Sequence, residues 1–445
     1  MQFVRHIRQI GLCFFLFCIC GATVSAQEAD FGQRIEIPAS FNPVGSGARA
    51  LGMGGAFISV ADDATAASWN PAGLIQLEKP EISIVGSFVH RIEDNSFETH
   101  PEADGAESVD VSDLNYFSAS YPFALWGYNM IVSLNWQHLY DMTRQWTFPI
   151  REEFSPDLFQ NQSVDSRQEG SLSALGLACA VQITPDISLG FTLNVWDDDI
   201  AGNEWTQKTW QWGDGNYYGD AYVFESYMYD RYSLSGVNMN FGLLWNVNAN
   251  LSLGAVLKTP FDADITHKHT GNYLIRQANP NIPDYMGNTD YEEDGTLSMP
   301  LSFGIGAAYR FSDRLTASLD IYRTQWDDFE YENSKGEKKS PITGKESDMD
   351  PTHQVRMGAE YLFILPQYVI PVRAGLFYDP APAEGSPDDF YGFSIGSGIA
   401  WKRFAFDMAW QFRMGNDAGG AGLENWGLSQ DVREHTLYTS IIVHF

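Results

Sequence analysis

The sequence is poor in cysteine, and this shortage excludes a fold held together by disulfides. Only four cysteines occur in 445 residues, and Cys13, Cys18 and Cys20 lie together near the N-terminus. If that segment is removed, Cys179 is the single thiol left. One thiol can form neither an intrachain disulfide nor a zinc cluster based on sulfur.

Basic residues and long hydrophobic runs are also scarce. The chain has 27 Lys and Arg against 57 Asp and Glu, so its formal charge is −30. Such a surface repels phosphates, and nucleic acid is excluded as a partner. Beyond the N-terminus no apolar run approaches the ~20 residues of a membrane helix. What remains is a large soluble β protein or a transmembrane β-barrel, in which apolar and polar residues alternate.

The N-terminus has the three parts of a secretory signal peptide. Arg5 and Arg8 precede the apolar stretch 10–20, and small residues follow up to Ala26. This order predicts a signal peptide over residues 1–26, cleaved after Ala26, and not a buried hydrophobic helix. Lipidation at Cys20 is not expected, because the bulky Ile19 precedes it.

The body of the chain alternates between apolar and polar residues with the period of a β-strand. Near the C-terminus, Phe404, Phe406 and Met408 fall on one face and Ala405 and Asp407 on the other. A soluble sandwich would also alternate, so this pattern alone does not decide between the two classes. Fourteen strands are predicted, at residues 81–90, 113–121, 127–139, 170–183, 186–197, 229–247, 250–259, 297–311, 314–325, 353–363, 368–378, 389–401, 402–413 and 434–445.

The connections between these strands decide for a barrel. Short turns such as Pro185-Asp186 alternate regularly with long loops, which are expected on the cell exterior. The long loops predicted first are 92–112, 140–169, 196–228 and 260–295. Short turns on one rim, long loops on the other and a final Phe445 are typical of bacterial outer-membrane barrels. The predicted fold is all-β, a 14-stranded antiparallel transmembrane β-barrel over residues 81–445, located in the bacterial outer membrane.

The segment before the first strand is rich in small residues and does not alternate. It contains Gly-Ala-Arg-Ala-Leu-Gly-Met-Gly-Gly-Ala-Phe at 47–57 and Trp-Asn-Pro-Ala-Gly-Leu at 69–74. A phosphate-binding loop is not expected, because no strand precedes the glycines and no Lys-Ser or Lys-Thr follows them. We interpret residues 27–80 as an N-terminal hatch, or plug, inside the barrel lumen.

These motifs closely resemble the hatch of the FadL family of outer-membrane transporters for long-chain fatty acids and hydrocarbons. The family forms 14-stranded barrels closed by such a hatch. A related PorV-like branch, with a very similar hatch, serves as an outer-membrane component of a protein secretion system, and the motif does not separate the two. The resemblance covers these hatch residues: Gly52, Gly54, Gly55, Asp62, Asp63, Asn70, Pro71 and Ala72.

The resemblance implies passive uptake of a hydrophobic small molecule. In the family the molecule is caught by outer loops, enters the barrel and leaves sideways into the membrane through an opening in the wall. Outer-membrane lipid and lipopolysaccharide are then partners, as is a secretion protein for the PorV-like branch. The third strand lacks a proline that would bend it at such an opening. The loops that match the family's groove carry aromatic and apolar candidates: Trp205, Trp210, Trp212, Tyr217, Tyr218, Phe224, Tyr273, Ile275, Tyr285 and Met286.

Strand alternation places several charged residues in the lumen. Arg356, Glu360 and Arg373 are the main candidates, with Asp320 and Asp407 beside them. The arginines are able to bind the carboxylate of a substrate, but pairing across the lumen to hold the hatch is the favoured interpretation.

Nothing in the sequence predicts catalysis, a cofactor or a metal. No serine lies in a nucleophile motif, so an outer-membrane hydrolase is a distant alternative. His267 and His269 flank Lys268 in a polar segment and are expected to be solvated and not to bind a metal.

Overall fold

The computed structural model describes residues 45–420, 423 and 426–445. The predicted signal peptide and the first part of the predicted hatch lie outside these residues. No helix among the described residues is long and apolar enough to cross a membrane.

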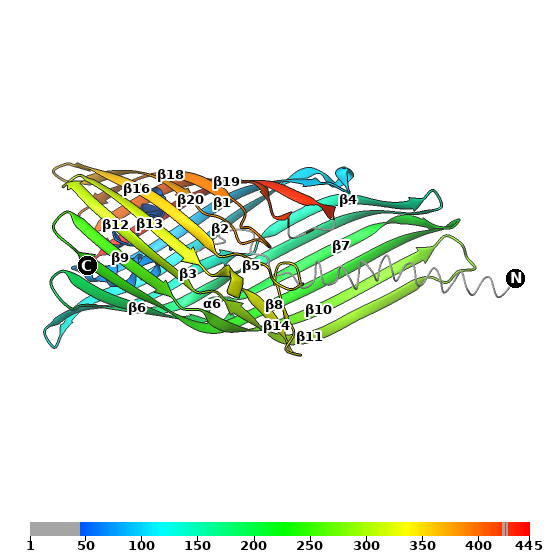
Figure 1. Ribbon diagram of the computed structural model, residues 1–445, viewed down its shortest axis with the longest axis horizontal. Helices are drawn as coiled ribbons and strands as arrows, with labels where there is room; N and C mark the ends of the chain where they lie inside the picture. Colours follow the sequence, from blue (N-terminus) through cyan, green and yellow to red (C-terminus); the bar gives the residue numbers. More distant parts are fainter. Residues whose placement is uncertain (1–44, 421–422, 424–425) are drawn as a thin grey trace.

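Fourteen antiparallel strands form the closed wall of a barrel (Figure 1). Each pairs with the next, and the last, β20, pairs with the first, β1, over Glu81↔His444 to Phe97↔Leu428. All fourteen predicted strands are confirmed, although several are longer than predicted. The wall strands are β1 (Glu81–Phe97), β2 (Gly105–Leu125), β3 (Tyr128–Asp141), β5 (Leu158–Gln182), β6 (Ile187–Trp196), β8 (Asp220–Asn246), β9 (Leu251–Lys258), β12 (Ser302–Ser312), β13 (Leu315–Thr324), β16 (Thr352–Ile364), β17 (Val369–Tyr378), β18 (Phe390–Trp401), β19 (Phe404–Ala418) and β20 (Leu428–His444).

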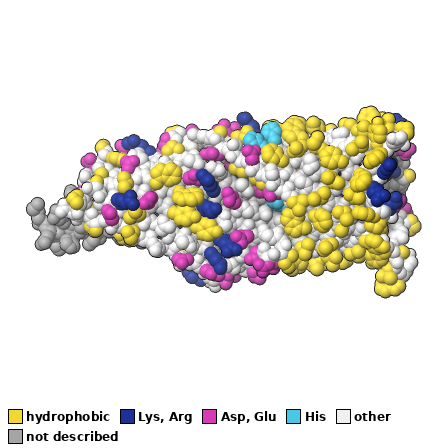
Figure 2. Space-filling model, turned by 180° about the vertical axis from the view of Figure 1, so that it is seen from behind, with side chains coloured by type: hydrophobic (Ala, Val, Ile, Leu, Met, Phe, Trp, Pro, Cys, Tyr) yellow, Lys and Arg dark blue, Asp and Glu magenta, His cyan; other side chains and the backbone are white. Residues whose placement is uncertain are grey.

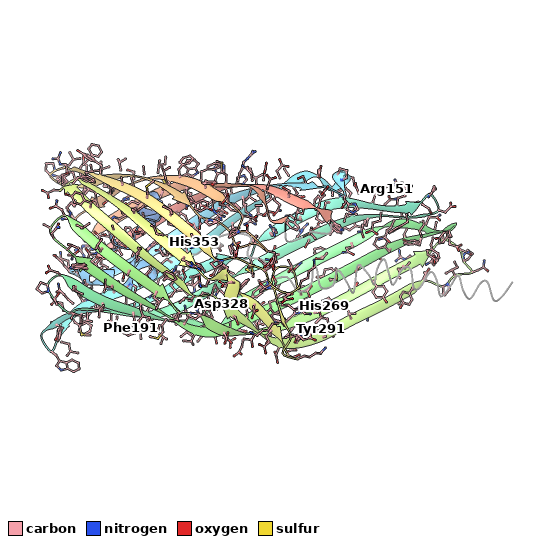
Figure 3. The ribbon with its side chains drawn as sticks, viewed as in Figure 1. Arg151, Phe191, His269, Tyr291, Asp328 and His353 are labelled. Carbon is pink, nitrogen blue, oxygen red and sulfur yellow. The ribbon has the colours of Figure 1, made fainter. Side chains whose placement is uncertain are left out.

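The wall has an apolar outer surface around one end of the molecule. On β19, Phe404, Phe406 and Met408 are exposed, while Asp407 between them is buried in the lumen. Figure 2 shows hydrophobic side chains gathered as a belt over this end, with charged side chains scattered over the rest. Phe191, labelled in Figure 3, lies within the belt. This belt is the surface expected to face lipid.

The predicted long loops at 92–112, 140–169, 196–228 and 260–295 are largely β-structure, so that part of the sequence interpretation is wrong. Neighbouring strands continue past the belt as one sheet, here called the extension, with Arg151 on one of its strands (Figure 3). It is built from the first parts of β5 and β8 and from β4 (Arg144–Ser155), β7 (Glu204–Tyr217), β10 (Phe261–Gln277), β11 (Tyr285–Met299), β14 (Glu330–Asn333) and β15 (Lys338–Lys339). Its outer face carries charged side chains, so its strands lack the regular apolar alternation of the belt.

The described part of the hatch, residues 45–80, lies inside the barrel. Its helices are short because its sequence is rich in glycine and turns: α4 (Ala48–Gly52), α5 (Ala66–Trp69) and the 3-10 helix η1 (Pro71–Gln76). Phe57 and Trp69 are fully buried in a cluster that includes Ile131 and Tyr322 of the wall. Three further short helices lie between strands: η2 (Pro101–Ala103), α6 (Asp198–Ala201) and η3 (Trp326–Asp328).

Candidate functional site

The Asn-Pro-Ala turn of the hatch rests on two glycines of the wall. Gly190 of β6 and Gly242 of β8 lie directly opposite each other. A Cβ atom on Gly190 would lie 2.4 Å from the Pro71 carbonyl carbon, and one on Gly242 would lie 2.1 Å from Asn70 Oδ1. Any larger residue at either position would therefore displace the turn.

Asn70 holds this turn together and fastens it to the wall. It is fully buried, and its Oδ1 accepts a hydrogen bond from the Ala72 amide at 3.1 Å, capping η1. Its Nδ2 donates to the Ile58 carbonyl at 2.8 Å and to the Leu243 carbonyl of β8 at 3.0 Å. One amide thus connects two parts of the hatch and one wall strand.

A second pair of wall glycines packs against the hatch at Met53 and Gly54. Gly358 of β16 and Gly375 of β17 face each other, and Cβ atoms there would lie 2.3 Å from the Met53 carbonyl oxygen and 2.1 Å from the Gly54 amide nitrogen. Gly54 has φ +68, a conformation that glycine adopts without strain. Its amide donates to Ser394 Oγ of β18 at 2.9 Å. Backbone therefore packs against backbone at this contact.

A network of buried charges joins the hatch to β16, β17 and β19. Arg373 donates to Glu360 at 2.6 Å and to Asp407 at 2.5 Å. Glu360 also accepts from Arg49 of α4, at 3.0 and 3.1 Å, and Arg49 pairs with Asp62 within the hatch. Glu360 and Arg373 thus form an ion pair in the lumen, and Glu360 links this pair to the hatch through Arg49.

Arg356 and Asp320 contact the hatch backbone directly. Arg356 donates to the Gly54 carbonyl at 3.1 Å and pairs with Asp379 at 3.0 Å. Asp320 accepts from the amides of Phe57 and Ile58 at 2.6 and 2.8 Å. In this structure the two groups bind the hatch, and Arg356 also lines a cavity of the lumen.

The remaining hatch candidates lie within the same packing. Gly52 touches the wall at Gly396, where a Cβ would lie 3.3 Å from the Gly396 Cα, and a Cβ on Gly55 would lie 3.0 Å from Arg356. Asp63 is buried and accepts from the Thr65 amide and hydroxyl at 2.8 and 2.6 Å.

A cavity, here called the upper cavity, lies in the lumen between the hatch and the extension. It holds about 700 Å³ of empty space, part of it open solvent. Aromatic and apolar residues form about half of its lining, among them Leu139, Tyr140, Trp196, Phe261, Met299 and Trp326. The rest is polar and consists of Lys258, the amides of Gln137, Asn194, Asn238, Asn240 and Gln354, and the hydroxyls of Thr259, Ser302 and Thr324. A lining that combines apolar surface with polar groups suits a small amphiphile.

The ladder between β2 and β3 ends early on the side of the extension, which leaves a gap between the ends of these two strands in the otherwise closed wall. Among the described residues, the two strands pair only from Leu125↔Tyr128 to Tyr116↔Gln137. Beyond Tyr116, β2 keeps its pairing with β1, while β3 pairs with β5 through a bulge between His138 and Tyr140. A β-bulge bends the strand that carries it, so β3 is bent here without a proline.

A second cavity, here called the seam cavity, lies at this gap. It holds about 880 Å³, again including open solvent, and reaches from Leu51 of the hatch to Asp113 and Asn115 of β2 and to His138 of β3. Leu114 and Phe117, on either side of the gap's start in β2, are 43% and 41% exposed on the outer surface. The gap therefore begins within the apolar belt.

The two cavities meet at β3. Gln137 and Leu139 line both of them, and Leu139 is the residue at the bulge. The upper cavity and the seam cavity are thus neighbours across Gln137 and Leu139.

The residues of the predicted aromatic groove do not lie together in the structure. None of its ten residues lines either cavity. Trp205, Phe224 and Ile275 are buried inside the extension, and half-buried Tyr217 packs against the last two. Tyr273 contacts Tyr285 with ring centroids 5.5 Å apart. The others are on the outer face, half-buried or exposed: Trp210, Trp212, Tyr218, Tyr285 and Met286.

Sequence reasoning missed the lining of the two cavities and misplaced two histidines. Lys258 and Trp196 lie at the ends of β9 and β6, inside the predicted strands 250–259 and 186–197, and strand alternation alone would have turned Lys258 inward beside Val256. Leu139 carried no comparable signal, because a bulge depends on the partner strand. His267 and His269, expected to be solvated, are 3% and 2% exposed because β10 turns them into the extension.

Comparison with known families gives one match over most of the chain. Residues 39–414 match the family described as outer membrane protein transport protein (OMPP1/FadL/TodX). No curated protein matches the sequence.

Several solved structures share the fold at low sequence identity. A FadL homologue from Pseudomonas aeruginosa is 12% identical, with a TM-score of 0.58 and coverage of 90% of this chain and 98% of the other. The toluene transporter TodX from Pseudomonas putida is 13% identical, with a TM-score of 0.55 and coverage of 91% and 100%. The toluene transporter TbuX from Ralstonia pickettii is 15% identical, with a TM-score of 0.51 and coverage of 91% and 100%.

Proposed function

The chain belongs to the outer membrane protein transport family (OMPP1/FadL/TodX), as a channel for hydrophobic compounds, and we propose that it takes up long-chain fatty acids or hydrocarbons by passive diffusion. The molecule enters the upper cavity from the extension and passes Leu139. It leaves sideways into the membrane between β2 and β3. The observation that carries this route is the seam cavity, which connects the hatch to a gap in the wall.

A sideways exit suits an apolar cargo. Moving each CH₂ group out of water into an apolar medium is favourable by about 0.8 kcal/mol. A long alkyl chain that left through the periplasmic end would lose this free energy again. The gap begins beside Leu114 and Phe117, so a chain passing through it meets lipid directly.

The hatch contacts support a route on this side of the barrel. The charged pairs and Ser394 hold the hatch on β16 to β19. At the gap, the described part of the hatch contributes only Gly45 and Leu51 to the lining of the seam cavity. A small shift of this edge widens the path while the anchored side stays in place.

The upper cavity favours a cargo with a polar end. Aromatic rings such as those of Trp196 and Trp326 form part of its lining, and Lys258 supplies a cation able to attract a carboxylate. A fatty acid satisfies both features, whereas a hydrocarbon uses the rings alone. Two proteins with this fold are named toluene transporters, so an aromatic hydrocarbon is the second cargo to test.

Uptake by cells tests the proposal. Cells that lack their own transporter would express this protein or its Asn70→Ala variant and receive a labelled long-chain fatty acid or, separately, a labelled aromatic hydrocarbon. We expect uptake of at least one cargo with the unmodified protein and less with the variant, since Asn70 fastens the hatch to β8.

The level of folded barrel in the outer membrane serves as the control for each strain. No uptake of either cargo, with the barrel present, would contradict the proposal. It would favour a role in protein secretion, which predicts a stable complex with another secretion protein.

A further inference from the structure

Two histidines and an aspartate meet inside the extension, away from both cavities. Asp230 lies on β8, and His267 and His269 lie on β10, with all three side chains nearly inaccessible to solvent. His267 Nε2 and His269 Nδ1 are each 2.8 Å from the same oxygen, Asp230 Oδ1. We propose that these three side chains bind one divalent transition-metal ion, with Zn²⁺ the best fit, and that the ion fastens β8 to β10.

Strand register brings the three groups together. His269 lies directly opposite Asp230 in the β8–β10 ladder, and His267 lies opposite Tyr232. Residues two apart on a strand point to the same face, so both histidines face the interior of the extension. Figure 3 shows His269 beside Tyr291 of β11, to which it is also paired. The site needs no loop to close it.

Aromatic rings hold both imidazoles in position. Tyr232 stacks on His267, with ring centroids 4.3 Å apart and planes 7° apart. Tyr291 stacks on His269 at 4.7 Å and 21°. Each imidazole is therefore covered on one face while a ring nitrogen points at Asp230. Ligands fixed in this way lose little freedom when an ion binds.

The second nitrogen of His269 has the partner that a metal-binding histidine needs. Its Nε2 lies 3.0 Å from the hydroxyl oxygen of Thr289 on β11. Histidines that bind metals almost always donate a hydrogen bond from their other ring nitrogen, which fixes the tautomer. Thr289 is placed to accept that bond.

A cation would also neutralise the buried aspartate. Among the ion pairs of the described residues, Asp230 contacts only His267 and His269, and neutral imidazoles bring hydrogen bonds without charge. A buried carboxylate is costly unless it is paired with a cation. Gln207 of β7 lies directly opposite Asp230, and its buried Oε1 has no hydrogen-bond partner in the described part of the chain. This oxygen could act as the fourth ligand of the ion, or it could accept a hydrogen bond from a water molecule bound to the ion.

The donor atoms select the class of ion. Two imidazole nitrogens and one carboxylate oxygen suit Zn²⁺ and its neighbours, while Ca²⁺ and Mg²⁺ prefer oxygen alone. Ligand atoms about 2.1 Å from a tetrahedral Zn²⁺ are about 3.4 Å apart. The two nitrogen–oxygen separations of 2.8 Å are shorter than this, so the side chains would move apart slightly to admit the ion, and all three donor atoms lie within 4.8 Å of one another.

The position of the cluster points to a structural role. None of its three residues lines the upper cavity or the seam cavity. The extension projects beyond the belt, and Cys179 of β5 is the only cysteine among the described residues, so no disulfide links the described strands. A metal between β8 and β10 would supply the missing cross-link at the centre of the sheet.

Zinc titration of the purified full-length protein tests the proposal. The protein is stripped with a chelator in detergent and titrated with Zn²⁺ by calorimetry, and Co²⁺ absorption reports nitrogen ligation. We expect one ion per chain. His267→Gln and Asp230→Asn should each weaken binding more than about 100-fold, since second-shell partners alone are worth 10- to 100-fold. His100→Gln removes a histidine that pairs with Glu102 in the connection between β1 and β2, and this variant should bind Zn²⁺ as the unmodified protein does.

Thr289→Val keeps all three ligands and is the variant least expected to disturb folding. We expect it to weaken binding about 10- to 100-fold, with the barrel intact by its heat-dependent mobility on a gel. A second readout is proteolysis, in which Zn²⁺ should slow cleavage between β8 and β11 of the unmodified protein. The absence of Zn²⁺ binding by folded unmodified protein would overturn the proposal, as would unchanged affinity in folded His267→Gln.

Discussion

Two sides of the barrel wall differ in how they meet the hatch. From β16 to β19 the ladder is continuous, and buried arginines and carboxylates join wall and hatch. Between β2 and β3 the ladder stops at Tyr116↔Gln137, and a cavity lies between the hatch and this gap. One side of the lumen therefore anchors the hatch, and the other leaves a path along it. A barrel closed by a hatch is able to pass a small molecule when one side of its wall holds the hatch and the other side provides the path.

Removing the central arginine of the anchored side should have the largest effect. Arg373→Met leaves Glu360 with only Arg49 and leaves Asp407 without the Arg373 partner shown in the structure. Breaking a buried ion pair in this way costs about 3–5 kcal/mol. The free energy of unfolding from detergent or lipid, measured with urea, should fall by that amount. Arg433→Met, at an exposed position on β20, serves as the control, and a loss under about 1 kcal/mol in Arg373→Met would contradict the anchor.

Substitution of Gly242, on which the Asn-Pro-Ala turn rests, should have the second-largest effect. Gly242→Ala places a Cβ 2.1 Å from Asn70 Oδ1, and overpacking of this kind costs about 1–3 kcal/mol. In the Asn70→Ala background the same substitution should cost less, because the clashing oxygen is absent. A double-mutant cycle of unfolding free energies measures this coupling. Additive effects would show that the turn does not rest on Gly242.

On the open side, a bulky residue at the bulge should slow transport without unfolding the barrel. Leu139→Trp fills the contact between the two cavities. An obstruction that adds 1.4 kcal/mol to the barrier reduces uptake about tenfold. Leu134→Trp, on the outer face of the same strand, is the matched control. Equal uptake in both variants would place the path elsewhere.

Substitution of Lys258 should have the smallest effect and should depend on the cargo. Lys258→Met removes a cation from the upper cavity but keeps most of its bulk. We expect fatty acid uptake to fall about 3-fold, as a partly exposed charge contact is worth up to about 1 kcal/mol, and hydrocarbon uptake to stay unchanged. Parallel uptake assays of the two cargoes separate these effects. An equal fall for both would mean that Lys258 shapes the cavity and does not bind a carboxylate.

The belt was predictable from the sequence, whereas the extension was not. Outward residues such as Phe404 and Phe406 face the belt surface, so alternation marks all fourteen wall strands. In β10, polar or charged residues such as Asp264, Lys268 and Thr270 occupy the exposed face, and the buried face includes His267 and His269. With polar residues on both faces, such a strand looks like a loop. Only its pairing with β8 and β11 shows otherwise.

The candidate site was predictable in part for a similar reason. Inward charges such as Arg356 and Arg373 follow from alternation, and the hatch motif pointed to Asn70. The gap at β2 and β3 depends on where a ladder ends, which no single residue encodes. The bulge at Leu139 likewise depends on the register between β3 and β5, which shifts at this residue.

A reversible cross-link across the gap tests the proposed exit most directly. Cysteines placed at Asp113 and His138, in a chain with Cys179→Ser, would be joined by a short thiol reagent that a reductant cleaves. The control joins cysteines at Met357 and Leu376, which already pair in the continuous wall. We predict that the cross-link at the gap abolishes uptake, that reductant restores it, and that the control changes nothing. Full uptake with the gap closed would contradict the account.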